Sequence, residues 1–171
     1  VLRTGIDSTV YYIDFSFDKL KLGGSAFAQS LDKIGKEVPT VQDSEYFANA
    51  FNAVQELINK ELILAGHDIS AGGMITTMLE MNFANTEGGL EVSLDEIPEK
   101  DLVKILFSEN PGILIQVEKT DEVEKILKKA GVAFIRLARP CDERHLLIHK
   151  DGADYQFFID HLRDVWFESS Y

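Results

Sequence analysis

Segments with strand character alternate with segments of helical periodicity along almost the whole chain, and this alternation constrains the fold more than any other feature. Residues 9–15 alternate β-branched and aromatic side chains and predict a first strand. The pattern predicts an α/β or α+β domain in which helices pack on a mixed sheet. Further strands are expected at 90–94, 113–117, 132–137, 146–149 and 155–158, and helices at 26–31, 44–64, 74–83, 99–107, 122–130 and 160–166.

The longest expected helix begins at Asp43 or Ser44, either of which can cap it, and continues to about residue 64. Apolar side chains recur along one of its faces at helical spacing. They are Phe47, Phe51, Val54, Ile58 and Leu62. We expect the two phenylalanines to pack against the sheet. Met74, Met78 and Met81 in the following helix are expected in the core, because methionine fills irregular apolar gaps.

Length and charge limit the classes of function. With 171 residues the chain is long enough for one well-buried domain, taken here as residues 1–171. No apolar run approaches the roughly 20 residues that span a bilayer. The net charge of −12 argues against nucleic acid and against anionic membranes as partners, since such binding needs clustered Lys and Arg. A phosphorylated small molecule remains compatible with an acidic protein.

Two observations predict a fragment of a larger chain. The sequence starts at Val1 without a Met, and it ends in a segment with Trp166 and other aromatic residues that normally pack against something. Apolar surface left by missing neighbours would favour self-association of the fragment. Cys141 is the only cysteine, so no internal disulfide can form, and a reducing cytoplasm fits this composition.

Two glycine pairs stand immediately before apolar helices, Gly23-Gly24 within residues 22–29 and Gly72-Gly73 within residues 67–74. Glycine permits positive φ and lets a ligand approach the backbone closely. The free N–H groups and the dipole of a first helical turn attract anions. Each turn is therefore a candidate phosphate site.

Polar side chains flank both turns. Asp68 could bind Mg²⁺ on a nucleotide, because hard cations prefer carboxylate oxygen. His67 could donate to a phosphate or move a proton. Ser25 and Ser70 could contact the same ligand. The alternative interpretation is a pair of tight connections in which both serines are simple helix caps.

The two segments, in this order and separated by a long helix, resemble the phosphoribosylformylglycinamidine synthase family. That family carries Leu-Gly-Gly-Ser/Thr-Ala-x-Ala-Gln followed by His-Asp-x-Ser-x-Gly-Gly, which correspond to residues 22–29 and 67–73. Residues 106–109 and 162–166 also resemble family segments. One departure is Ala71, where the family often has an acidic residue, so a metal contact there is lost or passes to Asp68.

The resemblance implies a three-layer α/β/α domain like the C-terminal domain of aminoimidazole ribonucleotide synthetase. It implies part of a cytoplasmic ligase that converts formylglycinamide ribonucleotide, glutamine and ATP into formylglycinamidine ribonucleotide in purine biosynthesis. ATP and Mg²⁺ would serve the full-length enzyme, with neither held tightly by this chain alone. The expected partners are the remaining synthetase domains and the glutaminase domain of the same protein. The isolated chain is expected to be inactive.

Among the site residues, the resemblance implies that Gly72 and Gly73 donate backbone N–H groups to a phosphate and that Asp68 faces the metal. Glu109 is a further candidate for the same cleft, and no catalytic residue is assigned. Cys141 lies beside acidic residues that oppose thiolate formation, so the glutaminase nucleophile is expected outside this chain. The remaining histidines are too dispersed for a recognisable metal-ligand motif; they are His145, His149 and His161.

Two alternatives stay open. The chain could belong to another enzyme of the same superfamily, of the aminoimidazole ribonucleotide synthetase, selenophosphate synthetase or thiamine monophosphate kinase type. The segment 22–29 argues against these, because it is associated with the amidotransferase. The chain could also be a non-catalytic nucleotide-binding or assembly module.

Overall fold

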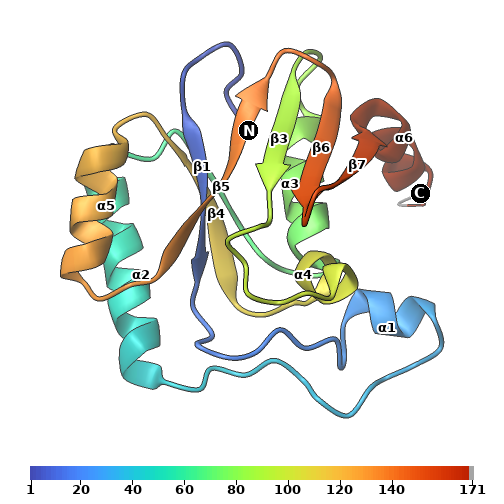
Figure 1. The fold of residues 1–171 in the computed structure, drawn as a ribbon, viewed down its shortest axis with the longest axis horizontal. Coiled ribbons are helices and arrows are strands. Elements are labelled where there is room, and N and C mark those ends of the chain that lie inside the picture. Colours follow the sequence, from blue (N-terminus) through green and yellow to red (C-terminus); the bar gives the residue numbers. More distant parts are fainter. Residues whose placement is uncertain (170–171) are drawn as a thin grey trace.

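The computed structural model describes residues 1–169, which form a seven-stranded mixed sheet with helices on both faces (Figure 1). The strand order is β2-β4-β1-β5-β3-β6-β7, and all neighbours are antiparallel except the parallel pair β3–β6. The strands are β1 (Thr9–Asp14), β2 (Ala65–Asp68), β3 (Gly89–Ser93), β4 (Gly112–Val117), β5 (Phe134–Cys141), β6 (His145–Lys150) and β7 (Ala153–Phe158). The helices are α1 (Ala26–Ser30), α2 (Ser44–Asn59), α3 (Gly73–Phe83), α4 (Leu102–Phe107), α5 (Thr120–Lys129) and α6 (Ile159–Ser169). The predicted α/β class with a mixed sheet is confirmed.

Two hydrophobic cores lie on opposite faces of the sheet. Because side chains of a strand alternate between faces, Tyr12 of β1 joins the core beneath α3 and α4, while Tyr11 and Ile13 join the core beneath α2 and α5. Figure 1 shows α2 and α5 side by side and α3 behind β3 and β6. The three-layer α/β/α arrangement is therefore confirmed for the half of the sheet that contains β2, β4 and β1. The three methionines of α3 are buried, as predicted.

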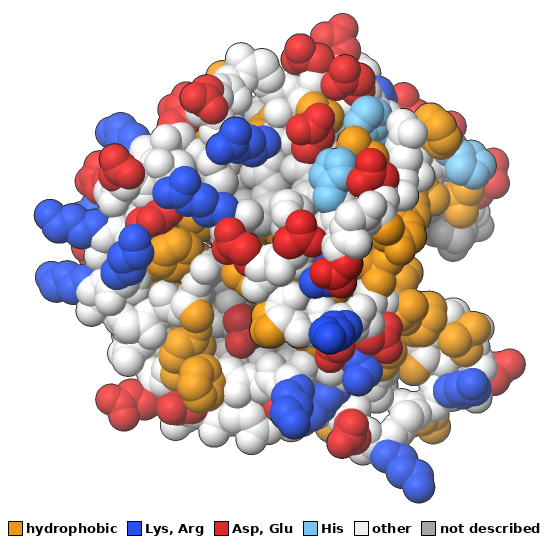
Figure 2. Space-filling view, in the orientation of Figure 1, with side chains coloured by type: hydrophobic (Ala, Val, Ile, Leu, Met, Phe, Trp, Pro, Cys, Tyr) orange, Lys and Arg blue, Asp and Glu red, His pale blue; other side chains and the backbone are white. Residues whose placement is uncertain are grey.

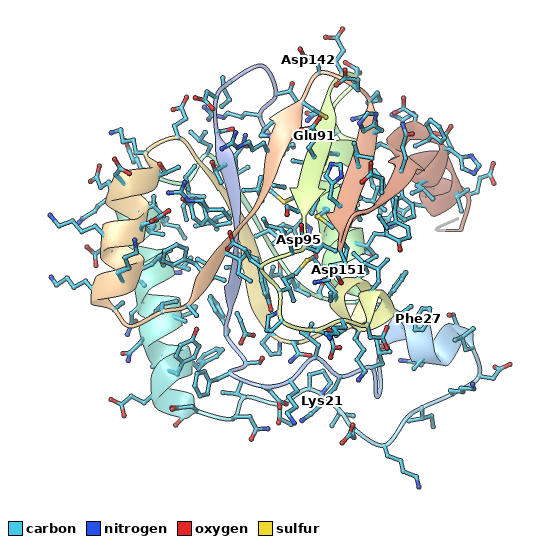
Figure 3. All side chains as sticks on the ribbon, in the orientation of Figure 1. Lys21, Phe27, Glu91, Asp95, Asp142 and Asp151 are labelled. Carbon is cyan, nitrogen blue, oxygen red and sulfur yellow. The ribbon has the colours of Figure 1, made fainter. Side chains whose placement is uncertain are left out.

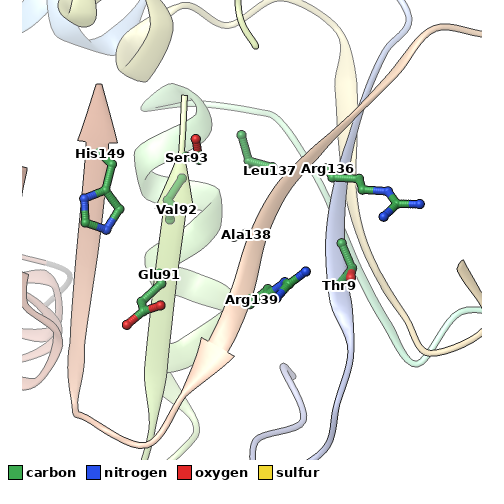
Figure 4. A pocket seen from close by; sticks show the side chains of 9 residues that line it. All are labelled: Thr9, Glu91, Val92, Ser93, Arg136, Leu137, Ala138, Arg139 and His149. Carbon is green, nitrogen blue, oxygen red and sulfur yellow. The ribbon is translucent and has the colours of Figure 1, made fainter. Parts of the chain in front are cut away.

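The other half of the sheet carries helices on one face only. Leu90 and Val92 of β3 point into the core beneath α3, whereas Glu91 and Ser93, which alternate with them, are exposed. Figure 4 shows side chains of β5, β3 and β6 around a shallow hollow of about 240 Å³ on this open face. Within residues 1–169, α2 and α5 cover only the opposite end of the sheet.

The strand β2 was not predicted, and the preceding helix ends at Asn59 rather than near residue 64. A Schellman motif ends it: the N–H of Leu62 donates to the carbonyl of Leu57, and that of Glu61 to the carbonyl of Ile58. Glu61 takes the left-handed conformation, with φ of 55°, at the position that glycine usually occupies. Because Glu61 stands where glycine is usual, the sequence does not clearly indicate that the helix ends there.

Helix α2 packs through a different face from the one expected. Its buried residues are Ala50, Ala53, Val54 and Leu57. The prediction that Phe51 packs against the sheet is wrong, since its side chain is 48% exposed. Phe47 is half-buried and meets Phe15 edge-to-face, with ring centroids 5.8 Å apart. Alanines let the helix lie close to the sheet, which displaces the phenylalanines to the edge of the contact.

No helix within residues 1–169 is both long enough and apolar enough to cross a membrane.

Candidate functional site

Glu109 joins the two glycine turns. One of its carboxylate oxygens accepts a hydrogen bond from the N–H of Ala26 at the start of α1 and another from the N–H of Gly72 at the start of α3, each 2.8 Å long. Segments 22–29 and 67–73 therefore lie side by side, as the hypothesis of a shared pocket edge requires. A carboxylate at two helix starts has a favourable charge, and hydrogen bonds to an ionised acceptor are stronger than neutral ones.

The backbone of the segment that follows α1 closes over the first turn. The N–H of Gly23 donates to the carbonyl of Glu37 over 2.8 Å, and that of Gly24 to the carbonyl of Ile34 over 2.7 Å. A Cβ on Gly23 would stand 2.2 Å from the Glu37 carbonyl oxygen, so the close approach requires glycine. Ser25 is buried, and its hydroxyl accepts from the N–H of Ala28, so it caps α1.

The second turn places α3 against the end of α4. Gly72 and Gly73 have φ of 88° and 74°, and a Cβ on Gly73 would lie 2.7 Å from the carbonyl oxygen of Leu106. The N–H of Gly73 donates to the carbonyl of Ser70 over 3.0 Å, and Gly72 donates to Glu109. In this conformation both glycine N–H groups are bonded within the chain. Ser70 is exposed and does not cap α3, whose N-cap is Gly72.

His67 and Asp68 end β2 beside this turn. Nδ1 of His67 lies 2.8 Å from the carbonyl oxygen of Asp68, and Nε2 lies 3.2 Å from a carboxylate oxygen of Glu80 in α3. Both ring nitrogens thus face oxygen atoms that can accept hydrogen bonds. His67 consequently links β2 to α3 through Glu80, and this contact of Glu80 was not predicted from the sequence.

The carboxylate of Asp68 faces solvent, with its side chain 77% exposed. It stands at the rim of a hollow of about 340 Å³ whose other walls are largely apolar and include Phe15, Phe51 and Pro111. One of its oxygens lies 3.6 Å from Nδ1 of His67, and an exposed carboxylate of this kind is suited to bind a hard cation such as Mg²⁺. Asp68 is therefore a singled-out residue whose side chain is accessible to a metal ion or a phosphate.

Asn110 fixes the segment that leads into the first turn and was not singled out from the sequence. It is buried; its Nδ2 donates to Ser16 Oγ and to the carbonyl of Lys19, both over 3.1 Å, and its Oδ1 accepts from the N–H of Lys21 at 3.3 Å. The only available signal was its place before Pro111, where Asn favours a turn.

Asp18 and an aromatic pair anchor the same segment. Burial raises the pKa of Asp18, but hydrogen bonds from Lys21, Thr40 and their neighbours outweigh it and lower the pKa to about 2. Phe27 of α1 stacks on Phe107 at the end of α4, with ring centroids 4.6 Å apart. Figure 3 shows Lys21 on the extended segment below the sheet and Phe27 where α1 meets α4. Asp18 thus holds the segment before the first turn, and the stack of Phe27 on Phe107 holds the helix after it.

The comparisons with known proteins agree with this architecture. Residues 9–146 match the family described as AIR synthase related protein, C-terminal domain. The chain is 35% identical over 171 residues to a probable phosphoribosylformylglycinamidine synthase of Arabidopsis thaliana, covering 98% of this chain and 12% of the relative. It is 31% identical over 166 residues to phosphoribosylformylglycinamidine synthase of Homo sapiens, covering 94% of this chain and 12% of that protein.

Solved structures show the same fold. Thermotoga maritima PurL complexed with ATP superimposes with a TM-score of 0.70 at 17% identity, covering 95% of this chain and 26% of that one. The complex of that protein with FGAR gives 0.68 at 20% identity, covering 94% and 28%. The chain therefore spans about an eighth of the length of its curated relatives. Since the match extends from β1 to the start of β6, the chain belongs to the AIR synthase related protein family and is its C-terminal domain.

Proposed function

We propose that this chain is a synthetase domain of phosphoribosylformylglycinamidine synthase, the ligase that forms formylglycinamidine ribonucleotide from formylglycinamide ribonucleotide, glutamine and ATP. Relatives of that name align with nearly the whole chain. Because the chain spans 12% of those relatives, the reaction would also need the other synthetase domains and a glutaminase domain. We propose a cytoplasmic location, with which a single cysteine is compatible.

Within that enzyme, the two glycine turns would form one edge of a nucleotide or phosphate site. The observation that carries this proposal is the Glu109 carboxylate, which bonds the starts of α1 and α3 at once. It indicates that the junction accepts negatively charged oxygen. The proposed site comprises Gly23, Gly24, Ser25, His67, Asp68, Ser70, Gly72, Gly73 and Glu109.

The residues of this site would divide their tasks according to exposure. Gly23, Ser25 and Gly73 are buried and would shape the turns. Gly24, Asp68 and Ser70 are exposed and would meet the ligand. The N–H groups of Gly23, Gly24 and Gly73 are all bonded within the chain, so this division leaves the side chains of Asp68 and Ser70 and the exposed backbone of Gly24 as the contacts.

Asp68 would hold Mg²⁺ together with phosphate oxygens of ATP, since its carboxylate is exposed and both ligand types suit this ion. Bound there, the ion would neutralise charge on the phosphoryl group that is transferred. The residues of this chain would orient that phosphate, and His67 would keep the end of β2 fixed through Glu80.

The test uses the full-length protein that contains this chain. ADP release should require formylglycinamide ribonucleotide and glutamine together, and a protein that forms no formylglycinamidine ribonucleotide would contradict the proposed activity. Asp68→Asn should raise the Kd for MgATP on the order of tenfold, which equals about 1.4 kcal/mol. Asp151→Asn, at an exposed turn after β6, is the matched control. Equal MgATP affinity in both variants would remove Asp68 from the site.

A further inference from the structure

Three side chains with different metal-binding atoms meet at the turn between β5 and β6. Cys141 ends β5, His145 begins β6, and Glu143 lies between them. One ligand atom from each, a sulfur, a nitrogen and a carboxylate oxygen, lies within 4.8 Å of the other two. Ligands of a tetrahedral zinc site stand roughly 3.5 Å apart, given bonds of about 2.0–2.3 Å. Small side-chain rotations of the exposed Glu143 and of Cys141 would bring the three ligand atoms to this separation.

A glycine brings the three residues together. Gly89 of β3 is paired with Cys141, and β3 runs on beside β6 in parallel register, with Leu90 opposite Leu146. A Cβ on Gly89 would lie 1.9 Å from the carbonyl oxygen of His145 and 2.6 Å from that of Glu143. The turn therefore folds directly over the glycine backbone. Any other residue there would push the Cys141 and His145 strands apart.

One ring nitrogen of His145 has no hydrogen-bond partner among the described residues. Its Nδ1 lies 3.3 Å from the side-chain amide of Gln156 on β7, whereas its Nε2 is buried and has no hydrogen-bond partner within residues 1–169. A buried polar atom without a partner is costly and uncommon in a native protein. If the Gln156 amide turns its oxygen to Nδ1–H, Nε2 presents a lone pair, which is the arrangement of a metal-bound histidine with an outer partner.

Acidic side chains lie near the cluster, and Arg139 stands opposite Glu91 in the register of β3 and β5. Glu91 lies on the same open face of the sheet and, with Glu143, acts electrostatically on Cys141. Figure 3 places Asp142 at the tip of this turn and Glu91 beneath it, and Figure 2 shows histidine side chains among acidic ones on this part of the surface. The whole chain carries a net charge of −12.

We propose that Cys141, Glu143 and His145 bind a divalent transition-metal ion of the zinc class, with a fourth position open to water or to a ligand. A thiolate–imidazole–carboxylate set suits zinc and disfavours Mg²⁺ and Ca²⁺, which prefer oxygen. This metal would fasten the β5–β6 turn. The site lies on β5 and β6, apart from the proposed Mg²⁺ position at Asp68 on β2, and does not depend on the proposed function.

Cobalt(II) tests the proposal, because a thiolate bound to Co²⁺ gives a charge-transfer absorption that carboxylate and imidazole alone do not. The protein should develop this absorption at one equivalent of Co²⁺, and Zn²⁺ should abolish it by competition. Cys141→Ser should remove the absorption, and His145→Gln should weaken Co²⁺ binding at least tenfold. His149→Gln is the control, since His149 lies on β6 but is engaged with Asp154 at 2.6 Å.

A second variant separates a loss of metal binding from a loss of folding. Gln156→Ala removes only the outer partner of His145 and should weaken Co²⁺ binding about 10- to 100-fold with an unchanged circular dichroism spectrum. Wild-type protein that binds Co²⁺ without thiolate absorption overturns the proposal. Equal Co²⁺ affinity in wild type, Cys141→Ser and His145→Gln overturns it as well.

Discussion

The two halves of the sheet differ in how they are covered. In the half made of β2, β4 and β1, central strands are buried on both faces, and β4 reads as a nearly continuous apolar run, Gly112–Val117. In the half made of β5, β3, β6 and β7, one face has no helix over it, and in β3 (Gly89–Ser93) Glu91 and Ser93 are exposed on that face. Helices on both faces hold the strands of the first half in place. The open face of the second half leaves titratable side chains accessible to a ligand.

The difference also separates two kinds of site. The glycine turns and Glu109 lie beside the doubly covered half, where backbone geometry does the positioning. The cluster of Cys141, Glu143 and His145 lies on the open half, where side chains face outward from strands. Together the two proposals would give this fold an anion-accepting edge and a cation-accepting face.

The clearest test of this comparison shortens one apolar side chain in each half of the sheet. Ile115→Ala removes a fully buried side chain of β4 and should lower the free energy of unfolding by about 3 kcal/mol, because it leaves a cavity between packed layers. Leu147→Ala on the half-buried open side of β6 should cost less than about 1 kcal/mol. Urea denaturation measures both, and equal losses would contradict the contrast between the halves.

Where α3 meets α4, close packing should matter more than backbone conformation. Gly73→Ala should destabilise the protein by about 2–3 kcal/mol, because its Cβ would collide with the end of α4 at positive φ. Gly131→Ala has a similar φ of 69° with nothing within 4 Å and should cost only about 1 kcal/mol. Thermal unfolding of the two variants distinguishes the effects; similar shifts in Tm would mean that φ alone decides.

Removing the Glu109 bridge should loosen both glycine turns together. Glu109→Ala leaves two N–H groups without their acceptor and should cost about 2 kcal/mol, whereas Glu109→Gln keeps an acceptor oxygen and should cost about 1 kcal/mol. Hydrogen exchange should accelerate at the amides of Ala26 and Gly72. If only one of the two amides exchanges faster, the turns are not coupled through this carboxylate.

The smallest expected effect concerns pH. Hydrogen bonds from Lys128, Arg136 and Tyr11 lower the pKa of Glu124 to about 2, and burial raises the pKa of Tyr11 to about 12. Since the folded state depresses the Glu124 pKa, this carboxylate stabilises the protein above its ordinary pKa of 4.5 and loses that contribution as pH falls towards 2. Allowing for solvent screening, the contribution is about 1 kcal/mol.

The variant Glu124→Gln should therefore unfold at the same denaturant concentration as wild type near pH 2 and earlier than wild type at pH 7. Glu118→Gln, an exposed change after β4, provides the control. A Glu124→Gln deficit that stays constant from pH 7 to pH 2 would show that packing, and not charge, gives Glu124 its effect.

Much of the fold could be predicted because side-chain periodicity reports directly on burial. The strands at β1, β3 and β4 and the helix at α3 follow their alternating or helical patterns closely. The end of α2 could not be predicted, because Glu61 supplies a left-handed residue where glycine is the usual signal. The inward face of α2 was also missed, since alanines gain burial only through the shape of the sheet they meet.

The sequence by itself determined the two glycine turns, because only glycine tolerates their positive φ and close contacts, and it indicated the alternation that makes an α/β sheet. Tertiary structure alone decided that Glu109 bonds both turns, that Asn110 holds the segment before the first, and that Cys141 and His145 meet over Gly89. These contacts join residues through strand order and register, and those depend on how the layers pack together rather than on any local pattern.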